Sequence, residues 1–442
     1  MPLLIVGCLA VAAVSLTVPS APTYDSWAWL VWGREILHLD LVTLDGPSWK
    51  PLPVLFTTPF ALFGDDVAPA LWLVVARAGG LLAFAMAFRL AARLAGPWAG
   101  VIAALALLLA DGFVFNLARG TSEGLLVVAV LWGIERHLDG HRTQAFLLGF
   151  AAALLRPEVW PFWGLYGLWL VYEAWDGRPP WRTIALVGCL GALTLVLWLL
   201  PEYLGSGDWF RAAERAREPN PGAAAFAQSP FLEVFRRSRA LLSFPVYLGA
   251  LVATAIALLR GDRLQLALAA VATTLTIGVA LMAEGGFAGN VRYLYLPVAL
   301  VCVLAGAGWV EVVRGARRWG PLVAVALVAW SISYVSDDIQ SLKEDRVETM
   351  FWANFYGPDL KFAIAQAGGE EKIKSCGHVF AGPFQVPALA WRLHMHTNQV
   401  EIYVFGPGTT LSLGNSHLAF DPRYPMYLKA RDWVIGSSCG RP

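Results

Sequence analysis

Long apolar runs separated by short polar loops occupy the first three quarters of the chain. A helix needs roughly 17–25 mostly apolar residues to cross the hydrocarbon core of a membrane. The first run has no A-x-A cleavage site after it, so we interpret it as a retained span and not as a signal peptide. The pattern predicts about eleven spans, at residues 2–20, 67–92, 96–110, 122–138, 143–156, 158–175, 183–201, 243–260, 264–283, 291–313 and 319–335.

Composition supports the same class of protein. Hydrophobic residues make up 57% of the 442 residues, charged residues only 15%, and the mean hydropathy is +0.56, whereas globular domains carry about 25% charge. The net charge is +1 and the arginines are dispersed, without the basic stripe of a nucleic-acid-binding protein. We therefore predict an all-α polytopic membrane protein that does not bind nucleic acid.

The distribution of arginines predicts the orientation in the membrane. Cytoplasmic loops carry an excess of Lys and Arg. With a cytoplasmic N-terminus, every inner loop has at least two arginines, and the short outer loops near 111–121, 156–158 and 284–292 have one each. The arginines of the inner loops are Arg89, Arg93, Arg136, Arg142, Arg178, Arg182, Arg260, Arg263, Arg314, Arg317 and Arg318.

The long connections then lie on the outer side. Residues 21–66 and 202–242 form two outer loops of a membrane domain at 1–335, and an odd number of spans places residues 336–442 outside as a C-terminal domain. Gly-Pro turns and β-type runs such as VEIYVF (400–405) predict a small mixed α/β fold. Cys376 and Cys439 lie in this domain and are able to pair if it is extracytoplasmic.

The first outer loop contains two unusual segments. In TYDSWAWLVWGREI (23–36), Trp29, Trp32 and Ile36 have helical spacing, which predicts an amphipathic helix in the membrane interface. The apolar segment 47–64 contains three prolines and is better suited to an interfacial or re-entrant position than to a straight span. Asp25 has two interpretations: it caps the helix, or it is a general base at the membrane surface.

Polar residues also gather in the next outer loop, DGFVFNLARGTSEGLL (111–126). Glu123 opens the fourth span, where an acid is costly unless it faces a cavity or a partner. The alternative is an acid that complements the helix dipole, with Ser122 as the cap. Asn116 and Arg119 lie in the same loop.

Three further outer segments carry arginine. LLRPEVWPFWGLY (154–166) has Arg156 and Glu158 in a tight turn, either as a local ion pair or as part of a site. GNVRYLYLP (289–297) has Arg292 beside Tyr293, where an arginine binds a phosphate or extends toward the interface. The loop 202–242 is rich in arginine, as in FRRSRA (235–240). This richness fits a solvated face or an attraction for phosphate-bearing lipid.

Several signatures of other functions are missing from the sequence. It has no Walker A loop, no H-E-x-x-H zinc pattern and no G-x-S-x-G nucleophile elbow. His394 and His396 lie close together but have no neighbouring acids or cysteines in the sequence, so we predict surface residues there and no metal site. Few charged residues lie inside the spans, whereas ion-coupled transporters place several near the midplane.

The ordered segments YDSWAWLVWGRE, RGTSEGLL, LLRPEVWPF and GNVRYLYLP resemble the GT-C superfamily of membrane glycosyltransferases. The likeness covers residues 1–335 and is greatest to bacterial members of the mannosyl- and arabinofuranosyltransferase type, which use polyprenyl-phosphate sugars. It implies a cell-envelope enzyme of the cytoplasmic membrane that acts on the extracytoplasmic side. Such an enzyme transfers a sugar with inversion from the lipid donor to a glycan or glycolipid.

The resemblance also implies roles for individual residues. Asp25 corresponds to the general base of the first outer loop. Many members have a second acid beside it, but Ser26 and Trp27 follow here, so a divalent metal is not supported and Glu123 is left as the second acid. The implied donor-phosphate residues are Arg292, Arg119, Lys50 and Arg156. The implied substrate-binding residues are Trp27, Trp49, Asn116, Tyr293 and Glu158.

Two other functions compete with this one. A flippase or transporter of lipid-linked sugars would need no bond chemistry, and a scaffold protein would need no site. The polar residues gather at one membrane face and not along a path through the midplane, which favours the enzyme.

Overall fold

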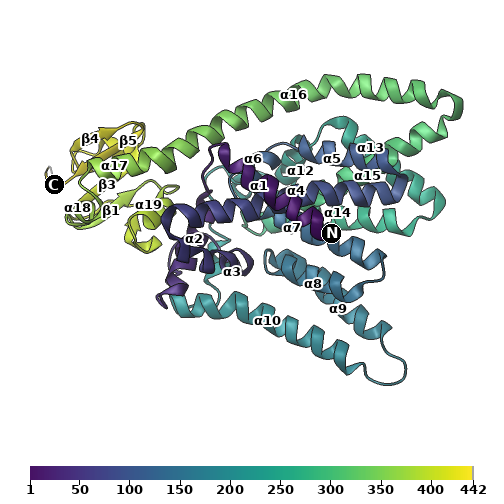
Figure 1. Cartoon of the computed structure of the whole chain (residues 1–442), viewed down its shortest axis with the longest axis horizontal. Coiled ribbons are helices and arrows are strands. Elements are labelled where there is room, and N and C mark those ends of the chain that lie inside the picture. Colours follow the sequence, from purple (N-terminus) through teal and green to yellow (C-terminus); the bar gives the residue numbers. More distant parts are fainter. Residues whose placement is uncertain (441–442) are drawn as a thin grey trace.

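The computed structural model describes residues 1–440, in which a bundle of helices is joined at one end to a small domain with a β-sheet (Figure 1). Long apolar segments form helices because backbone groups in a membrane must bond within their own segment. The helices of the bundle are α1 (Pro2–Val14), α2 (Tyr24–Leu37), α3 (Pro51–Phe60), α4 (Gly64–Ala95), α5 (Pro97–Leu108), α6 (Phe113–Ala118), α7 (Glu123–Leu138), α8 (Arg142–Ala153), α9 (Trp160–Glu173), α10 (Trp181–Ser206), α11 (Arg211–Arg215), α12 (Pro230–Ala240), α13 (Phe244–Arg260), α14 (Arg263–Glu284), α15 (Tyr295–Gly315) and α16 (Gly320–Asn354).

Each of the eleven predicted spans overlaps one helix of the described chain: α1, α4, α5, α7, α8, α9, α10, α13, α14, α15 and α16. Five helical segments of residues 1–440 are long and apolar enough to cross a membrane, and a sixth is added if the bent pair α12–α13 is one span. The five include α4, α10, α14, α15 and α16, and the other six helices have 12 to 17 residues. The polytopic helical fold predicted from the sequence is therefore confirmed.

Small residues allow the helices of the bundle to pack closely. A Cβ added to Gly306 would lie 2.2 Å from the carbonyl oxygen of Ala99, and one added to Gly308 would lie 2.0 Å from the carbonyl oxygen of Gly249. The backbone of α15 thus touches the backbones of α5 and α13 at these positions. Such contacts stabilise helix pairs in membranes, where no hydrophobic effect drives association.

The C-terminal domain has the mixed α/β fold that the sequence predicts. Its sheet has the strand order β2-β1-β3-β5-β4. Strand β1 pairs in parallel with both β2 and β3. Strand β5 pairs antiparallel with both β3 and β4. A disulfide joins Cys376 and Cys439, as predicted. Its elements are α17 (Leu360–Gln366), α18 (Glu370–Lys374), β1 (His378–Ala381), α19 (Val386–Arg392), β2 (Val400–Glu401), β3 (Gly408–Leu413), β4 (Met426–Ala430) and β5 (Trp433–Ser437).

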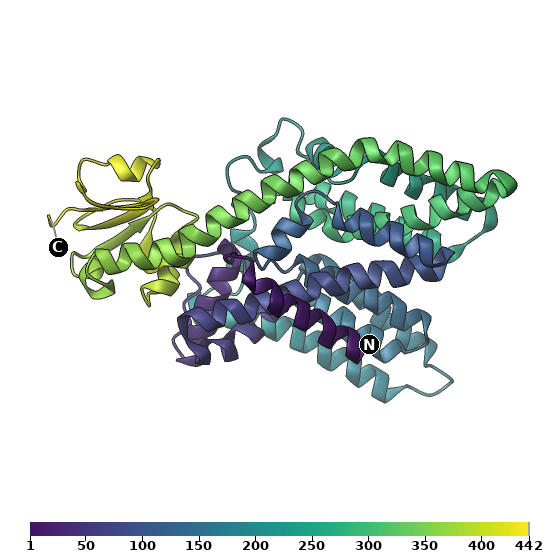
Figure 2. The ribbon, with the colours of Figure 1, turned by 45° about the horizontal axis from the view of Figure 1, so that its top comes forward.

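Helix α16 connects the two parts of the molecule. Figure 2 shows it running from the far end of the bundle along its side to the sheet domain. It passes without a break through residue 336, where we predicted a domain boundary. Just beyond its end, Phe355 stacks on Trp433 of β5 with ring centroids 4.2 Å apart. The division at 335/336 thus remains a prediction, and residues 441–442 of the predicted domain lie outside the described part.

Helix α2 differs from the expected interfacial helix. The side chains of Trp29 and Trp32 are completely buried, and they pack on Trp72 of α4 and on Trp49 with ring centroids 5.4 and 5.3 Å apart. The tryptophan face therefore contacts protein and not lipid. Helical spacing alone does not distinguish a helix face packed on protein from one in contact with lipid, because both environments favour apolar residues.

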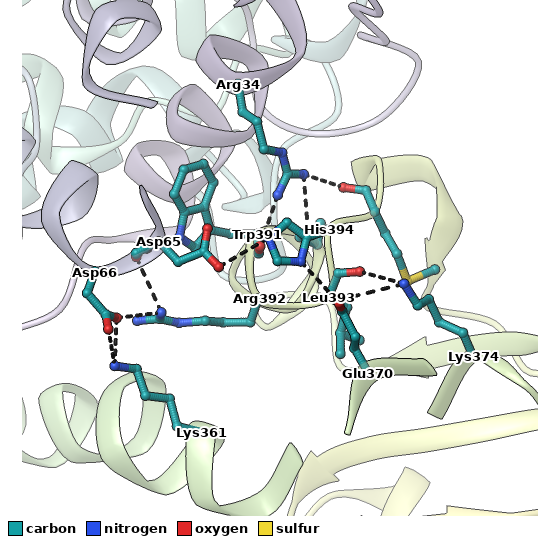
Figure 3. A network of polar contacts seen from close by, with 12 residues as sticks. Arg34, Asp65, Asp66, Lys361, Glu370, Lys374, Trp391, Arg392, Leu393 and His394 are labelled. Atoms are coloured by element: carbon teal, nitrogen blue, oxygen red, sulfur yellow. Dashed lines mark hydrogen bonds and ion pairs between the residues drawn. The ribbon is translucent and has the colours of Figure 1, made fainter. Parts of the chain in front are cut away.

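Helix α19 attaches the C-terminal domain to α2. The guanidinium of Arg34 donates hydrogen bonds to the carbonyl oxygens of Ala390, Trp391 and Met395 at 3.3, 3.0 and 2.8 Å, and lies 5.1 Å from the Trp391 ring centroid. Ion pairs between Asp66 and both Lys361 and Arg392, at 2.6 and 2.7 Å, extend the contact (Figure 3).

His394 also belongs to this joint. It contacts Asp65 of α4 at 3.1 Å and Glu370 of α18 at 2.9 Å. His396 similarly lies 2.8 Å from Glu35 and 3.3 Å from Asp40. The two histidines thus have acidic neighbours that are distant in the sequence. We predicted surface residues without such neighbours, because the sequence does not show that α19 is packed on the first outer loop.

Candidate functional site

Five charged side chains from five separate segments meet at the end of the bundle that faces the C-terminal domain. Asp25 lies in the first turn of α2, Lys50 precedes α3, Glu123 begins α7, Arg156 precedes the short helix Pro157–Val159, and Arg292 lies in the short helix η5 (Val291–Leu294). The charges of the other four all act on the ammonium group of Lys50. The outer loops predicted to form a site are thus brought together.

Asp25 and Arg292 form an ion pair. Oδ2 of Asp25 lies 3.1 Å from Nη1 of Arg292, and the two side chains are 16% and 27% exposed. Both groups thus remain partly accessible. The pairing joins the first outer loop to the start of α15.

Asp25 is not the cap of α2. Thr23 is the N-cap residue, and no side chain caps this helix. Ser26 does not cap it either, because its hydroxyl donates to the carbonyl oxygen of Gly120 at 2.6 Å. The indole of Trp72 donates to the same oxygen at 2.8 Å, and the amide of Thr23 donates to the carbonyl oxygen of Arg119 at 2.9 Å. These bonds fix the start of α2 against the second outer loop.

Glu123 and Arg156 form a second, more deeply buried pair. Nη2 of Arg156 donates to Oε1 of Glu123 at 2.7 Å, and the side chains are 8% and 1% exposed. The Arg156 guanidinium also lies 4.0 Å from the ring centroid of Tyr293. Glu158, the sequence neighbour expected to pair with Arg156, is 3.8 Å away and is the weaker partner. Glu123 is thus enclosed, whereas Asp25 is the accessible carboxylate.

Lys50 lies between these two pairs. Its ammonium group donates to the hydroxyl of Ser122 at 3.2 Å and lies 5.3 Å from the ring centroid of Trp29. Burial, followed by the charge of Arg156, lowers the pKa of Lys50 to about 8. The group is therefore still mostly protonated at neutral pH.

Arg119 lies at the edge of the cluster. Its guanidinium is 4.9 Å from the ring centroid of Phe115 and 5.6 Å from that of Trp352. Its Nε is buried without a hydrogen-bond partner among the described residues. The amide of Asn116 donates to the hydroxyl of Tyr295 at 3.0 Å and to the carbonyl oxygen of Gly112 at 2.7 Å, and its role in substrate binding remains a prediction.

Both tryptophans predicted to bind substrate are packed inside the protein. Trp27 and Trp49 are each only 2% exposed. The Arg392 guanidinium lies 5.8 Å from the Trp27 ring centroid, and the Trp49 indole donates to the carbonyl oxygen of Leu197 in α10 at 3.0 Å. They join the first outer loop to the C-terminal domain and to α10, and their role in substrate binding remains a prediction. Sequence patterns do not separate an aromatic ring that binds sugar from one that packs.

Sequence reasoning missed the contribution of the C-terminal part of α16. Trp352 lies over Arg119, and its indole donates to Glu348 at 3.0 Å. The aromatic run FWANFY (351–356) was the only available signal, and it follows a polar stretch of helix that we assigned to another domain. Within residues 1–440, no group of three or more His, Cys, Asp or Glu side chains is arranged to hold a metal ion.

With Glu158 beside Arg156 and Arg119 at its edge, the cluster carries four cations and three carboxylates, so one positive charge is not balanced within it. Asp25 and Glu123 are paired with arginine, and Lys50 has only a neutral hydroxyl as its hydrogen-bond partner. Buried charges in proteins are normally paired. The excess positive charge is suited to an anionic ligand, and the arginines offer the planar fork that phosphate prefers.

Comparisons with known proteins identify the fold. ArnT from Cupriavidus metallidurans, solved with bound undecaprenyl phosphate, matches with a TM-score of 0.56 and 16% identity over 99% of this chain and 97% of ArnT. ArnT in the apo state matches with a TM-score of 0.56 and 17% identity over the same shares. The oligosaccharyltransferase AglB from Archaeoglobus fulgidus matches with a TM-score of 0.49 and 12% identity over 92% of this chain and 69% of AglB.

No protein-family model matches the sequence, and no curated protein matches it. At these identities the likeness to ArnT shows the fold alone, which this chain and ArnT share over nearly their whole lengths.

Proposed function

We propose that the protein is a membrane glycosyltransferase that transfers a sugar from a polyprenyl-phosphate donor to an extracytoplasmic glycan or glycolipid, with Asp25 as the general base. One observation carries this proposal: an accessible carboxylate and an excess of cations meet at one end of a bundle with the fold of ArnT. The undecaprenyl phosphate bound to ArnT supports a lipid-phosphate donor here.

The roles of the residues follow from the chemistry of an inverting transfer. The acceptor hydroxyl attacks the anomeric carbon of the donor and gives its proton to the Asp25 carboxylate. The bond between the anomeric carbon and the phosphate oxygen breaks, and its electron pair leaves with the polyprenyl phosphate. Arg292 and Lys50 would stabilise the charge that develops on this leaving group. Glu123 would hold Arg156 in place and would not itself take a proton.

The Asp25–Arg292 pair also suggests how donor binding prepares the base. A carboxylate oxygen that accepts a hydrogen bond from a guanidinium is less available to accept one from the acceptor hydroxyl, and Arg292 donates such a bond to Asp25. A donor phosphate at Arg292 competes with Asp25 for the same guanidinium. Binding of the donor would therefore loosen the pair and leave the Asp25 carboxylate available to the acceptor.

The location supports the same function. The arginine distribution predicts that the site and the C-terminal domain are extracytoplasmic in the cytoplasmic membrane. The Cys376–Cys439 disulfide supports this side, since disulfides persist in oxidising compartments. The C-terminal domain, fixed over the first outer loop through Arg34, would form the acceptor side of the site.

The test is transfer by purified protein in nanodiscs supplied with radiolabelled polyprenyl-phosphate sugars and an oligosaccharide acceptor. Mannose and arabinofuranose donors come first, because of the resemblance noted in the sequence. We expect label in the acceptor. Movement of label across liposomes without transfer from any donor would instead identify a flippase.

A further inference from the structure

Helix α12 (Pro230–Ala240) lies across the direction of the spans. It is separated from the predicted span α13 by three residues, and the two helices meet at an angle of 104°. A helix perpendicular to a span lies in the plane of the membrane. The predicted orientation of the chain puts α12 at the level of the outer headgroups.

Both ends of α12 are held in this position. At its start, the amide of Phe231 donates to Oε2 of Glu284 at the end of α14, with a distance of 3.1 Å. Near its end, the hydroxyl of Tyr247 donates to the carbonyl oxygen of Ser238. Val234 is fully buried, with its Cγ2 packed near Gly289. The helix is therefore anchored to α13, to α14 and to the loop before η5.

One face of α12 is left exposed, and it combines apolar and cationic residues. Leu232 and Phe235 are 63% and 37% exposed, and the Arg236 side chain is 85% exposed. Arg239 is also exposed, and no carboxylate of the described chain forms an ion pair with it. These four residues follow the helical spacing of a single face.

The third arginine of the helix has a different environment. Arg237 donates to Glu233 at 2.8 Å and to the carbonyl oxygen of Gly222 at 2.9 Å, so it holds the loop before the helix. Arg236 reaches the same Glu233 only at 3.8 Å. Arg239 thus has no ion pair in the described chain, and the long contact of the highly exposed Arg236 with Glu233 leaves its guanidinium accessible from outside.

We propose that the exposed face of α12, formed by Leu232, Phe235, Arg236 and Arg239, binds anionic phospholipids of the outer leaflet. An in-plane helix that presents apolar residues beside cations inserts the former at the acyl boundary and pairs the latter with lipid phosphates. The positive charges of Arg236 and Arg239 are complementary to the negative charge of such lipids, which favours them as the ligand. The loop 202–242, which includes α12, is rich in arginine although the positive-inside rule disfavours arginine on the outer side.

This surface is distinct from the charge cluster but lies next to it. Helix α12 packs on η5, which contains Arg292. Anionic lipid bound to the exposed face of α12 would therefore stabilise the position of η5 and of Arg292 within it. The lipid-binding proposal itself does not require that the protein transfers sugar.

The test compares lipid binding in nanodiscs that contain phosphatidylcholine with or without phosphatidylglycerol. Native mass spectrometry of the released full-length protein counts the retained anionic lipids. Each arginine near a lipid surface contributes about fivefold to such binding. We expect wild type to retain phosphatidylglycerol in preference to phosphatidylcholine. In R236Q/R239Q this preference should be at least tenfold smaller.

The matched control is K372Q/K429Q, which removes two exposed cations of the C-terminal domain. It should retain the lipid preference of wild type. A wild type without preference for phosphatidylglycerol would overturn the proposal. An unchanged preference in R236Q/R239Q, or an equal loss in K372Q/K429Q, would overturn it as well.

Discussion

Asp25 and Arg292 are separated by 267 residues in the sequence, yet their side chains meet at 3.1 Å. The pair joins the carboxylate proposed as the base to the cation proposed to hold the donor phosphate. The pair therefore affects both the availability of Asp25 as a base and the availability of Arg292 for the donor phosphate, and this coupling can be measured.

Replacement of Asp25 by Asn should strengthen the binding of polyprenyl phosphate. The donor phosphate must compete with Asp25 for Arg292, so removing the carboxylate charge should lower the Kd on the order of tenfold, or about 1.4 kcal/mol. Titration of wild type and Asp25→Asn in nanodiscs measures this change. Weaker binding by Asp25→Asn would contradict the competition.

A double-mutant cycle separates this competition from a general change of charge. In the background of Arg292→Gln, the substitution Asp25→Asn should alter the affinity by less than about twofold. If Asp25→Asn still increases the affinity for polyprenyl phosphate about tenfold in the Arg292→Gln background, the ion pair is not the cause of the increase. Asp40→Asn, an exposed acid of the same outer loop, is the matched control.

Binding of the donor should weaken as the pH rises through about 8. The folded-state pKa of Lys50 is lowered to about 8, so its ammonium charge is present at pH 7 and largely absent at pH 9. The phosphodiester of a donor does not titrate in this window. We expect the affinity of wild type to fall by several-fold between pH 7 and pH 9.

Lys50→Arg is the control for this pH dependence. Arginine stays charged throughout the window, so the affinity of this variant should be nearly constant. A wild-type affinity that is flat from pH 7 to 9, or a Lys50→Arg variant with the same slope as wild type, would exclude Lys50 as the titrating group.

Loss of the Glu123 charge should destabilise the fold. Glu123→Gln leaves the Arg156 guanidinium buried without its anion, and breaking a buried pair from one side costs about 3–5 kcal/mol. Thermal unfolding in detergent should show a clear decrease in Tm. The double variant Glu123→Gln/Arg156→Met should recover much of it, and Glu158→Gln, the more exposed acid beside Arg156, should have little effect.

Arg34 should control how firmly the C-terminal domain is held. Arg34→Ala removes three hydrogen bonds to carbonyl oxygens and the contact with Trp391. We expect a loss of roughly 2 kcal/mol at this joint and faster proteolytic release of the domain. The exposed Arg346 provides the control, and equal rates for Arg34→Ala and Arg346→Ala would contradict this role.

The helices were predictable because an apolar run of sufficient length has few alternatives to a helix in a membrane. Short segments such as α5 and α8 were found for the same reason. The environment of each face was not predictable, as α2 demonstrates. Its tryptophans satisfy the pattern of an interfacial helix, yet Trp29 and Trp32 are buried against protein.

Among the members of the charge cluster, Glu123 was identified because an acid at a span end is costly without a partner. The resemblance noted in the sequence implied the roles of Asp25, Lys50, Arg156 and Arg292. Their pairing was not predictable, since it depends on contacts between distant loops. Arg156 has a neighbouring acid in Glu158 but pairs more closely with Glu123. Trp352 was missed because α16 continues well beyond its apolar part and carries this residue back to Arg119.

The most direct test of the central claim is the single-turnover rate of sugar transfer by Asp25→Asn at saturating donor and acceptor. Saturation removes the effect of the substitution on donor binding and leaves the proton transfer. If Asp25 is the general base, the rate should fall by about 10²–10⁴-fold, while Asp40→Asn keeps the rate of wild type. A rate for Asp25→Asn within about threefold of wild type would contradict the proposed role of Asp25.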